Sequence, residues 1–134
     1  MKDIIFDEFQ ASVNDCLIRH KSILDIITKL DESQARVNRS IVKCVTDCGC
    51  LKINADKQCV PENLKADNLD SVKECFKTHL SGSICDDCRE VLEKELGNHL
   101  FYINSICNVL NINLYDVLLK EYKNLSTLGK FNLK

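Results

Sequence analysis

Regular spacing of apolar residues over positions 84–110 predicts the longest helix of the chain. The apolar residues recur at steps of three and four, which places them on one helix face. These residues are Leu92, Leu96, Leu100, Ile103, Cys107 and Leu110. Ser83 and Asp86 match a capping box at the start of the helix. A helix of this length extends about 40 Å, so it predicts the central helix of a small domain.

Three more amphipathic patterns predict helices over residues 3–18, 21–45 and 114–126. Asn113 and Asp116 predict the cap of the last helix. The stripe of the second helix is Ile23, Ile27, Leu30, Val37, Ile41 and Cys44.

The chain changes character between the second and the central helix, where a Cys-x-Cys pair and Pro61, the only proline, occur. This segment predicts a loop with a short hairpin within 51–60 and a short helix over 69–80 that ends at Ser81 and Gly82. We therefore expect an all-α fold, an antiparallel bundle of about four long helices. It forms a single domain over residues 1–134 with a cysteine-rich insert at about 46–83.

Composition and charge narrow the partners and the compartment. A chain of 134 residues suits one domain with its own core. Its net charge of −2 indicates no nucleic acid or anionic membrane as an evident partner. No apolar run is long enough to cross a membrane, and acids stand where a signal peptide would be apolar. These features favour a cytoplasmic location.

Nine cysteines are the most unusual feature of the composition. A reducing compartment and an odd count both argue against a disulfide framework. Cys48 and Cys50 follow the second helix, and Cys85 and Cys88 begin the central helix. Antiparallel neighbouring helices would bring the two pairs together, where four thiolates would bind zinc tetrahedrally. Such a structural metal would close the long insert as a loop.

Other interpretations of these cysteines stay open at this point. The thiols are alternatively unligated and buried, a redox pair at Cys85 and Cys88, or ligands of an iron–sulfur cluster. A redox pair usually accompanies a βαβ context, which this sequence lacks. Cys44 and Cys59 are possible substitutes within the ligand set. The remaining cysteines are expected in the core because free cysteine packs as a small apolar residue: Cys16, Cys75 and Cys107.

Carboxylates on two of the predicted helices suggest a second kind of metal site. Glu95 and Asn98 share one helix face, and so do Asp31 and Ala35. Acids on facing helices of a bundle are a common way to hold divalent cations. The alternative is a solvated or salt-bridged surface, because basic partners are nearby: Lys29, Lys94, Arg36 and Arg39.

The sequence Glu95-Leu96-Gly97-Asn98 is followed by Leu100, Phe101 and Tyr102, and later by Leu114-Tyr115-Asp116-Val117. Together these short sequence motifs resemble those of the MazG-like, all-α nucleoside triphosphate pyrophosphohydrolases. The segment from Phe6 to Phe9 is similar to the first helix of that family. The resemblance covers most of the chain outside the cysteine-rich insert.

The resemblance implies a magnesium site that lacks some of its carboxylate ligands. The family motif E-E-x-x-E falls on Asp31, Glu32 and Ala35, and E-x-x-D falls on Glu95 and Asn98. Two of the five carboxylates are therefore missing, which should weaken Mg²⁺ binding. The family builds its sites across dimers, which implies a homodimer or a larger homo-oligomer. Phosphates of a nucleotide would meet basic residues near the C-terminus: Lys120, Lys123 or Lys130.

Two functions follow from these observations. The first is a divergent Mg²⁺-dependent nucleotide pyrophosphohydrolase that uses Asp31, Glu32, Glu95 and Asn98. The second is a non-catalytic, zinc-stapled helical module that binds a nucleotide or a protein partner. The missing carboxylates favour the second function. The motifs that match the MazG-like helices favour common ancestry with the enzymes of the first function.

Overall fold

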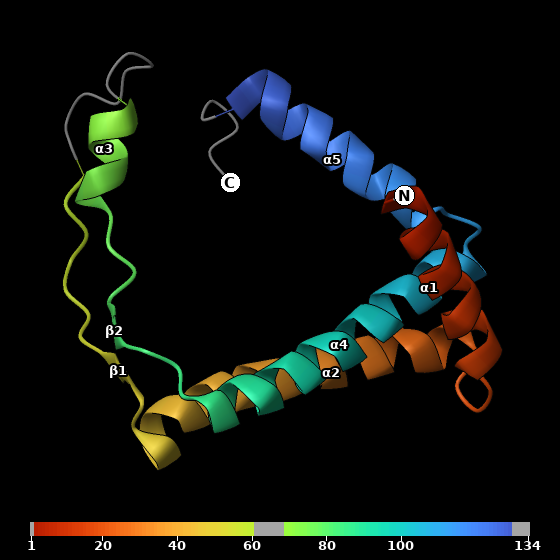
Figure 1. Ribbon diagram of the computed structural model, residues 1–134, viewed down its shortest axis with the longest axis horizontal. Helices are drawn as coiled ribbons and strands as arrows, with labels where there is room; N and C mark the ends of the chain where they lie inside the picture. The colour runs from red at the N-terminus through yellow and green to blue at the C-terminus, as the bar shows by residue number, and fades with distance from the viewer. Residues whose placement is uncertain (1, 61–68, 130–134) are drawn as a thin grey trace.

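The computed structural model describes residues 2–60 and 69–129, and most of them are helical (Figure 1). The expected all-α class is confirmed. The helices are α1 (Lys2–Cys16), α2 (Ile23–Lys43), α3 (Leu69–Cys75), α4 (Asp86–Val109) and α5 (Leu114–Leu128), and a π-helical turn, η1 (Cys44–Cys48), extends α2. Strands β1 (Leu51–Ile53) and β2 (Leu80–Gly82) pair as a small antiparallel sheet.

The body of the molecule is the pair of long helices α2 and α4, which run side by side in opposite directions (Figure 1). Helix α1 packs against α4, and α5 contacts α1. At the other end of the pair, β1, β2 and α3 form a projection that we call the arm, residues 51–60 and 69–82. The arm and α5 therefore leave the helix pair from opposite ends.

The buried line of α2 agrees with the predicted stripe only in part. Ile23, Ile27 and Ile41 are each at least one-third exposed, so this part of the prediction was wrong. Val37 and Cys44 are buried as predicted, and the line is completed by Ile26 and Ser33, which the stripe did not include. Ser33 faces α4, where its hydroxyl oxygen lies within hydrogen-bond distance of His99.

Only a few residues of the central helix α4 are likewise buried, and they lie along one narrow face of the helix. Its fully buried positions include the polar residues Asn104 and Ser105. The predicted apolar face is about half exposed at Leu96, Leu100 and Leu110. The molecule thus presents long apolar surfaces that its own described residues do not cover.

Buried polar groups lie between the helices. The Ser105 hydroxyl donates to the Phe101 carbonyl at 2.8 Å, and Ser33 donates to the Leu30 carbonyl at 2.8 Å. Ser33 Oγ also lies 2.7 Å from His99 Nδ1, which links α2 to α4. Because Ser33 has one hydrogen to donate, the bond to Leu30 requires His99 Nδ1 to be the donor. Asn104 is fully buried, and neither polar atom of its side chain has a partner among the described residues.

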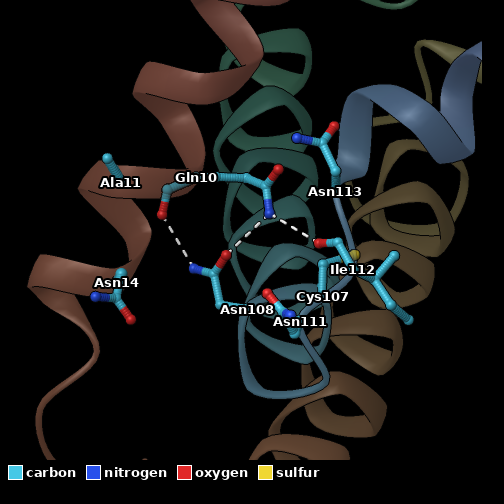
Figure 2. A pocket seen from close by; sticks show the side chains of 8 residues that line it. All are labelled: Gln10, Ala11, Asn14, Cys107, Asn108, Asn111, Ile112 and Asn113. Carbon is cyan, nitrogen blue, oxygen red and sulfur yellow. Dashed lines mark hydrogen bonds between the residues drawn. The ribbon is translucent and has the colours of Figure 1, made fainter.

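A glutamine on α1 fixes the turn between α4 and α5 (Figure 2). Gln10 Nε2 donates to Asn108 Oδ1 at 2.9 Å and to the Ile112 carbonyl at 3.1 Å. Gln10 Oε1 accepts from the Leu114 N–H at 2.9 Å. Asn108 Nδ2 donates back to the Gln10 carbonyl at 3.0 Å. One side chain thereby satisfies backbone groups at the end of one helix and the start of the next.

The caps of the last two helices had different outcomes. Asn113 Oδ1 accepts from the Asp116 N–H at 3.0 Å, so the predicted cap of α5 is confirmed. Helix α4 is capped by Cys85 and not by Ser83 as predicted. Residues 80–82 belong to a strand, which moves the helix start beyond Ser83.

The strands of the insert pair with partners farther along the sequence than predicted. The expected hairpin within 51–60 is absent among the described residues, since β1 pairs with β2 in the register Leu51 with Gly82. Residues 80–82 were predicted to end a helix, and they form this second strand. Beyond the strands, Gln58 exchanges two hydrogen bonds with the Lys77 backbone, at 2.8 and 3.0 Å. Pro61 lies outside the described residues.

A membrane-spanning helix would need a long stretch with high hydropathy and few charges. None of the helices in residues 2–60 and 69–129 meets that requirement.

Candidate metal centre

Four cysteines meet where α2 ends, α4 begins and the arm departs. Cys48 closes the π-helical turn, and Gly49 then adopts a left-handed conformation with φ of 78°. This reversal leads directly to Cys50 and strand β1. On the other side, Cys85 and Cys88 lie at the first turn of α4. The antiparallel pairing of α2 and α4 therefore brings the two cysteine pairs together.

The β1–β2 pairing holds the two halves of the cluster at close range. Gly82 pairs with Leu51, next to Cys50, and it has a φ of 85°. A Cβ atom at Gly82 would collide with the Cys50 carbonyl oxygen. Glycine is therefore required here both for its backbone conformation and for the close approach of the two chains.

The sulfur separations suit a shared metal. All four Sγ atoms lie within 4.8 Å of one another, and Cys48 Sγ is 3.8 Å from Cys85 Sγ. Metal–sulfur bonds of about 2.3 Å in a tetrahedron give sulfur–sulfur edges of about 3.8 Å. The wider separations are within reach of small side-chain rotations. All four cysteines are free thiols, so each sulfur is available as a metal ligand.

Local hydrogen bonds and thiol contacts give the cysteines unequal acidity. The backbone N–H of Cys88 donates to Cys85 Sγ at 3.4 Å, at the N-terminus of α4. A backbone hydrogen bond from Cys85 lowers the pKa of Cys50 to about 7. Hydrogen bonding with the Cys85 thiol, followed by desolvation, raises the pKa of Cys88. Four thiolates this close repel one another, and a divalent cation would neutralise that charge.

The expected meeting of Cys48, Cys50, Cys85 and Cys88 is confirmed. The two possible substitutes differ in position. Cys44 borders the cluster, since the Cys50 thiol lies 3.7 Å from the Cys44 carbonyl, but its own thiol donates to the Ser40 carbonyl at 3.1 Å. Cys59 is exposed on the arm.

The three cysteines predicted for the core differ in exposure. Cys107 is buried as predicted, and Cys75 is half-buried. Cys16 is exposed, so its core assignment was wrong. It lies at the last position of α1.

The predicted carboxylates lie on the helix pair but do not gather within one chain. Asp31 and Glu32 are exposed, Glu95 is half-buried and Asn98 is exposed. Among the described residues, the four cysteines are the only group of three or more potential ligands close enough to share an ion.

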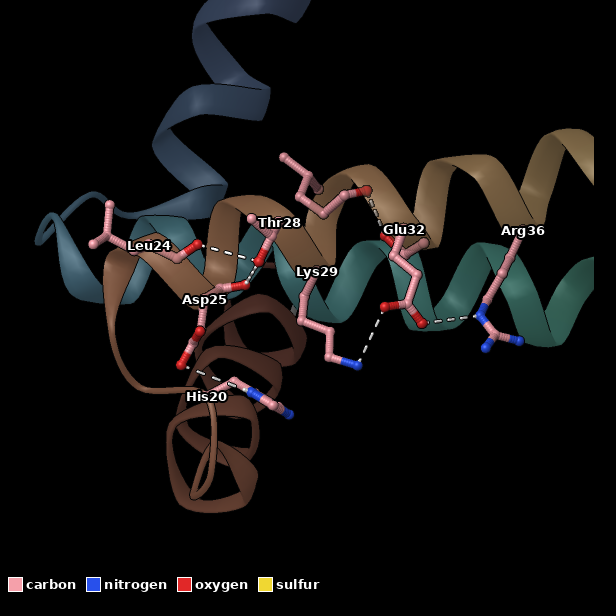
Figure 3. Close-up of polar contacts among 9 residues, drawn as sticks. His20, Leu24, Asp25, Thr28, Lys29, Glu32 and Arg36 are labelled. Atoms are coloured by element: carbon pink, nitrogen blue, oxygen red, sulfur yellow. Dashed lines mark hydrogen bonds and ion pairs between the residues drawn. The ribbon is translucent and has the colours of Figure 1, made fainter.

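Glu32 takes part in a surface ion-pair ladder (Figure 3). Its carboxylate lies 3.4 Å from Lys29 Nζ and 3.3 Å from Arg36 Nε. The Lys29 ammonium, with a smaller contribution from Arg36, holds the pKa of Glu32 below its usual value. This geometry agrees with the salt-bridged alternative for this residue.

The predicted phosphate-binding lysines are only partly described. Lys120 and Lys123 are exposed on α5, and Lys130 lies outside the described residues.

A groove beside α4 was not anticipated from the sequence. It has a volume of about 620 Å³ and lies where the connection between α1 and α2 passes α4. Only Asn98 among its lining residues was predicted as a site residue. The sequence signal was the pair Arg19-His20 between two predicted helices. The position of this pair opposite α4 depends on the tertiary fold.

Comparison with models of known protein families, with curated proteins and with solved structures finds no match for this chain. The fold and the site therefore define the class by themselves. It is a mostly helical protein with a four-cysteine cluster at a helix junction.

Two glycines allow the metal centre to be tested by backbone substitution. We expect Gly82→Ala to weaken metal retention strongly, because the new Cβ collides with the Cys50 carbonyl oxygen. Gly49→Ala is the matched control, since Gly49 also has a positive φ but has open space around its Cβ position. Competition with a chelator measures metal affinity in both variants. Equal retention in the two variants would contradict the role assigned to the close approach at Gly82.

Proposed function

We propose that this protein is a zinc-stapled helical module. One zinc ion per chain, bound by Cys48, Cys50, Cys85 and Cys88, joins the end of α2, the start of α4 and the base of the arm. The observation that carries the proposal is the convergence of four free thiols within 4.8 Å. A complete set of four thiolates leaves no open coordination position, which is typical of structural zinc.

The arm supplies the physical need for such a staple. Leu51 and Val72 are its buried apolar residues among those described, whereas Ile53, Val60 and Phe76 are largely exposed. An arm with so little core gains little from hydrophobic burial. Structural zinc contributes on the order of 10 kcal/mol at neutral pH, which is enough to order its base.

Purified protein tests the metal directly. We expect about one zinc per chain by elemental analysis. Cys85→Ser should remove the ion and lower the melting temperature sharply, because three thiolates and a hydroxyl bind zinc far less well. Cys59→Ser is the control, since Cys59 is an exposed thiol of the arm outside the cluster. A metal-free natural protein with undiminished stability would disprove the zinc staple.

We further propose that the module is a homodimer, and surface area supports this. The chain exposes 10308 Å², whereas a compact monomer of 15.3 kDa exposes about 7,100 Å². The excess is about 3,000 Å². Obligate homodimers bury about 1,000–2,500 Å² on each chain, so a second copy can account for about one-third to three-quarters of the excess.

The uncovered helix faces are suited to pairing with themselves. Helix α5 has no buried residue within the chain. Its exposed apolar residues are Val117, Leu118, Tyr122, Leu125 and Leu128. Ile27 and Ile41 on α2 and Leu100 on α4 add further apolar surface. We propose that two copies cover these faces with one another, in agreement with the homodimer that the MazG-like resemblance implies.

Light scattering over a range of concentrations tests the dimer. We expect twice the chain mass for the natural protein and a shift toward monomer for Leu118→Asp, because a charge in an apolar interface loses its solvation. Ser126→Asp introduces the same charge on the same exposed helix and serves as the control. A mass of one chain at all concentrations would exclude the dimer.

The second candidate is a Mg²⁺-dependent pyrophosphohydrolase of the MazG-like kind, and one observation favours it. Glu95 is half-buried, and one turn further Asn98 lines the groove beside α4. A dimer would add carboxylates from a second copy to the same region. The absent acids at Ala35 and Asn98 nevertheless leave few anionic ligands for a magnesium ion that must neutralise a triphosphate.

We expect very weak or absent release of pyrophosphate from nucleoside triphosphates with Mg²⁺ or Mn²⁺. Restoring both acids, Ala35→Glu with Asn98→Asp, should increase Mg²⁺ affinity because carboxylate oxygens are its preferred ligands. Pyrophosphate release and Mg²⁺ titration measure the two effects. Brisk turnover by the natural sequence that is lost in Glu95→Gln would show that the protein is an active enzyme.

A further inference from the structure

The four sulfurs of the cysteine cluster differ in their access to solvent. Cys48 is exposed, whereas the other three cysteines of the cluster are half-buried. Cys48 closes the π-helical turn just before the left-handed Gly49, where the chain leaves α2 for the arm. Small oxidants attack cysteine sulfurs according to their thiolate character and their exposure. Cys48 is therefore the sulfur of the cluster that a dissolved oxidant meets first.

The exposed sulfur has a second sulfur in contact with it. Cys48 Sγ lies 3.8 Å from Cys85 Sγ, although the two residues are 37 positions apart in the sequence. A disulfide bond is about 2.05 Å long, so the two sulfurs need to approach by about 1.8 Å to bond. Cys85 Sγ also accepts the Cys88 backbone N–H at 3.4 Å, at the start of α4.

Two other pairings within the cluster compete with this one. Cys48 and Cys50 are separated by one residue, and the Cys50 thiol donates to the Cys44 carbonyl at 3.7 Å. Cys85 and Cys88 are three positions apart, but both are half-buried. Exposure and contact together therefore favour an oxidation that begins at Cys48 and ends with a bond to Cys85.

We propose that Cys48 and Cys85 form a site of reversible oxidation by hydrogen peroxide, and that this oxidation releases the zinc and frees the arm. The inference rests on the zinc staple proposed above and names its regulation. The Cys48 thiolate attacks one peroxide oxygen, the O–O bond breaks, and a sulfenic acid forms as hydroxide leaves. The Cys85 thiolate then attacks the Cys48 sulfur and displaces a second hydroxide. Two protons convert both hydroxides to water, and two electrons pass from sulfur to oxygen.

This disulfide holds the helix pair together but does not hold the arm. It joins the end of η1 to the residue that caps α4, so it replaces the metal across the helix ends. The two remaining thiolates, Cys50 and Cys88, are too few for a tetrahedral structural zinc site. Cys50 directly precedes β1, where the arm leaves the body (Figure 1). Leu51 and Val72 are the buried apolar residues of the described arm, so its base loosens when the metal leaves.

Peroxide treatment of the zinc-loaded natural protein tests the site of oxidation. One equivalent of hydrogen peroxide is added, the remaining thiols are alkylated, and the protein is digested with trypsin without reduction. Digestion places Cys48 in peptide 44–52 and Cys85 in peptide 78–89. We expect a disulfide that links these two peptides, assigned to the two sulfurs by fragmentation. About one zinc ion should be released for each disulfide formed, since a structural site needs all four ligands.

Hydrogen exchange on the same samples tests the consequence for the arm. Backbone amides of residues 51–60 and 69–82 should exchange about tenfold faster or more after oxidation, because the base of the arm has lost its metal. Exchange in α2 and α4 should stay unchanged, because the disulfide joins their ends. A dithiol reductant added together with zinc should reverse both the cross-link and the faster exchange.

The double variant Cys16→Ser with Cys59→Ser is the matched control. Both thiols are exposed and lie outside the cluster, so the variant should give the same cross-link and the same release of zinc. Loss of the cross-link in this variant would show that one of these two thiols takes part and would overturn the assignment.

Several results with the natural protein would also overturn the inference. These are a disulfide confined to either peptide, zinc that stays bound after the cross-link forms, arm amides with unchanged exchange, and resistance of the cluster to excess peroxide. Zinc content is measured before peroxide is added. A protein without zinc at that stage contradicts the staple itself, whereas a zinc-loaded protein that gives any of these results contradicts only its regulation.

Discussion

The meeting of four cysteine sulfurs at one end of the α2–α4 pair is the contact on which the rest of this structure depends. Three parts of the chain join there: the π-helical turn after α2, the paired strands at the base of the arm, and the first turn of α4. Each part has little apolar core of its own, and Cys44 and Leu51 are the nearby buried apolar residues. The four sulfur atoms lie within 4.8 Å of one another, which is compatible with a metal ion that would join the three parts.

The opposite end of the helix pair is held by a different kind of interaction. Gln10 satisfies groups from Asn108, Ile112 and Leu114, and so fixes the direction in which α5 leaves the body. Neutral amide groups are sufficient to hold α1 against the α4–α5 turn, because each hydrogen-bond donor of Gln10 and Asn108 meets an acceptor. Between the two ends, the described residues leave long apolar faces of the helices exposed.

Local patterns in the sequence predicted the long helices well. They could not determine which face of a helix is buried or which strands pair. The helices and the Asn113 cap depend on neighbours three or four residues away, which the sequence displays directly. The choice of Ile26 over Ile27 as the buried residue depends on how α2 is rotated relative to the helices packed against it, which periodicity alone does not determine. The four-cysteine cluster was predictable because two short motifs flanked antiparallel helices. The groove was not, since it requires Arg19 to lie opposite Tyr102.

The middle of the helix pair bears on whether the module retains any chemistry. At the two positions where the MazG-like resemblance would place further acids, this chain has Ala35 and Asn98, and both are exposed. Glu32 lies near them on α2, and its carboxylate is held in surface ion pairs with Lys29 and Arg36. The contact between the helices in this region is the hydrogen bond between Ser33 Oγ and His99 Nδ1 at 2.7 Å, which does not involve a carboxylate. A magnesium ion here would therefore need anionic ligands beyond those that the described residues of one chain bring together.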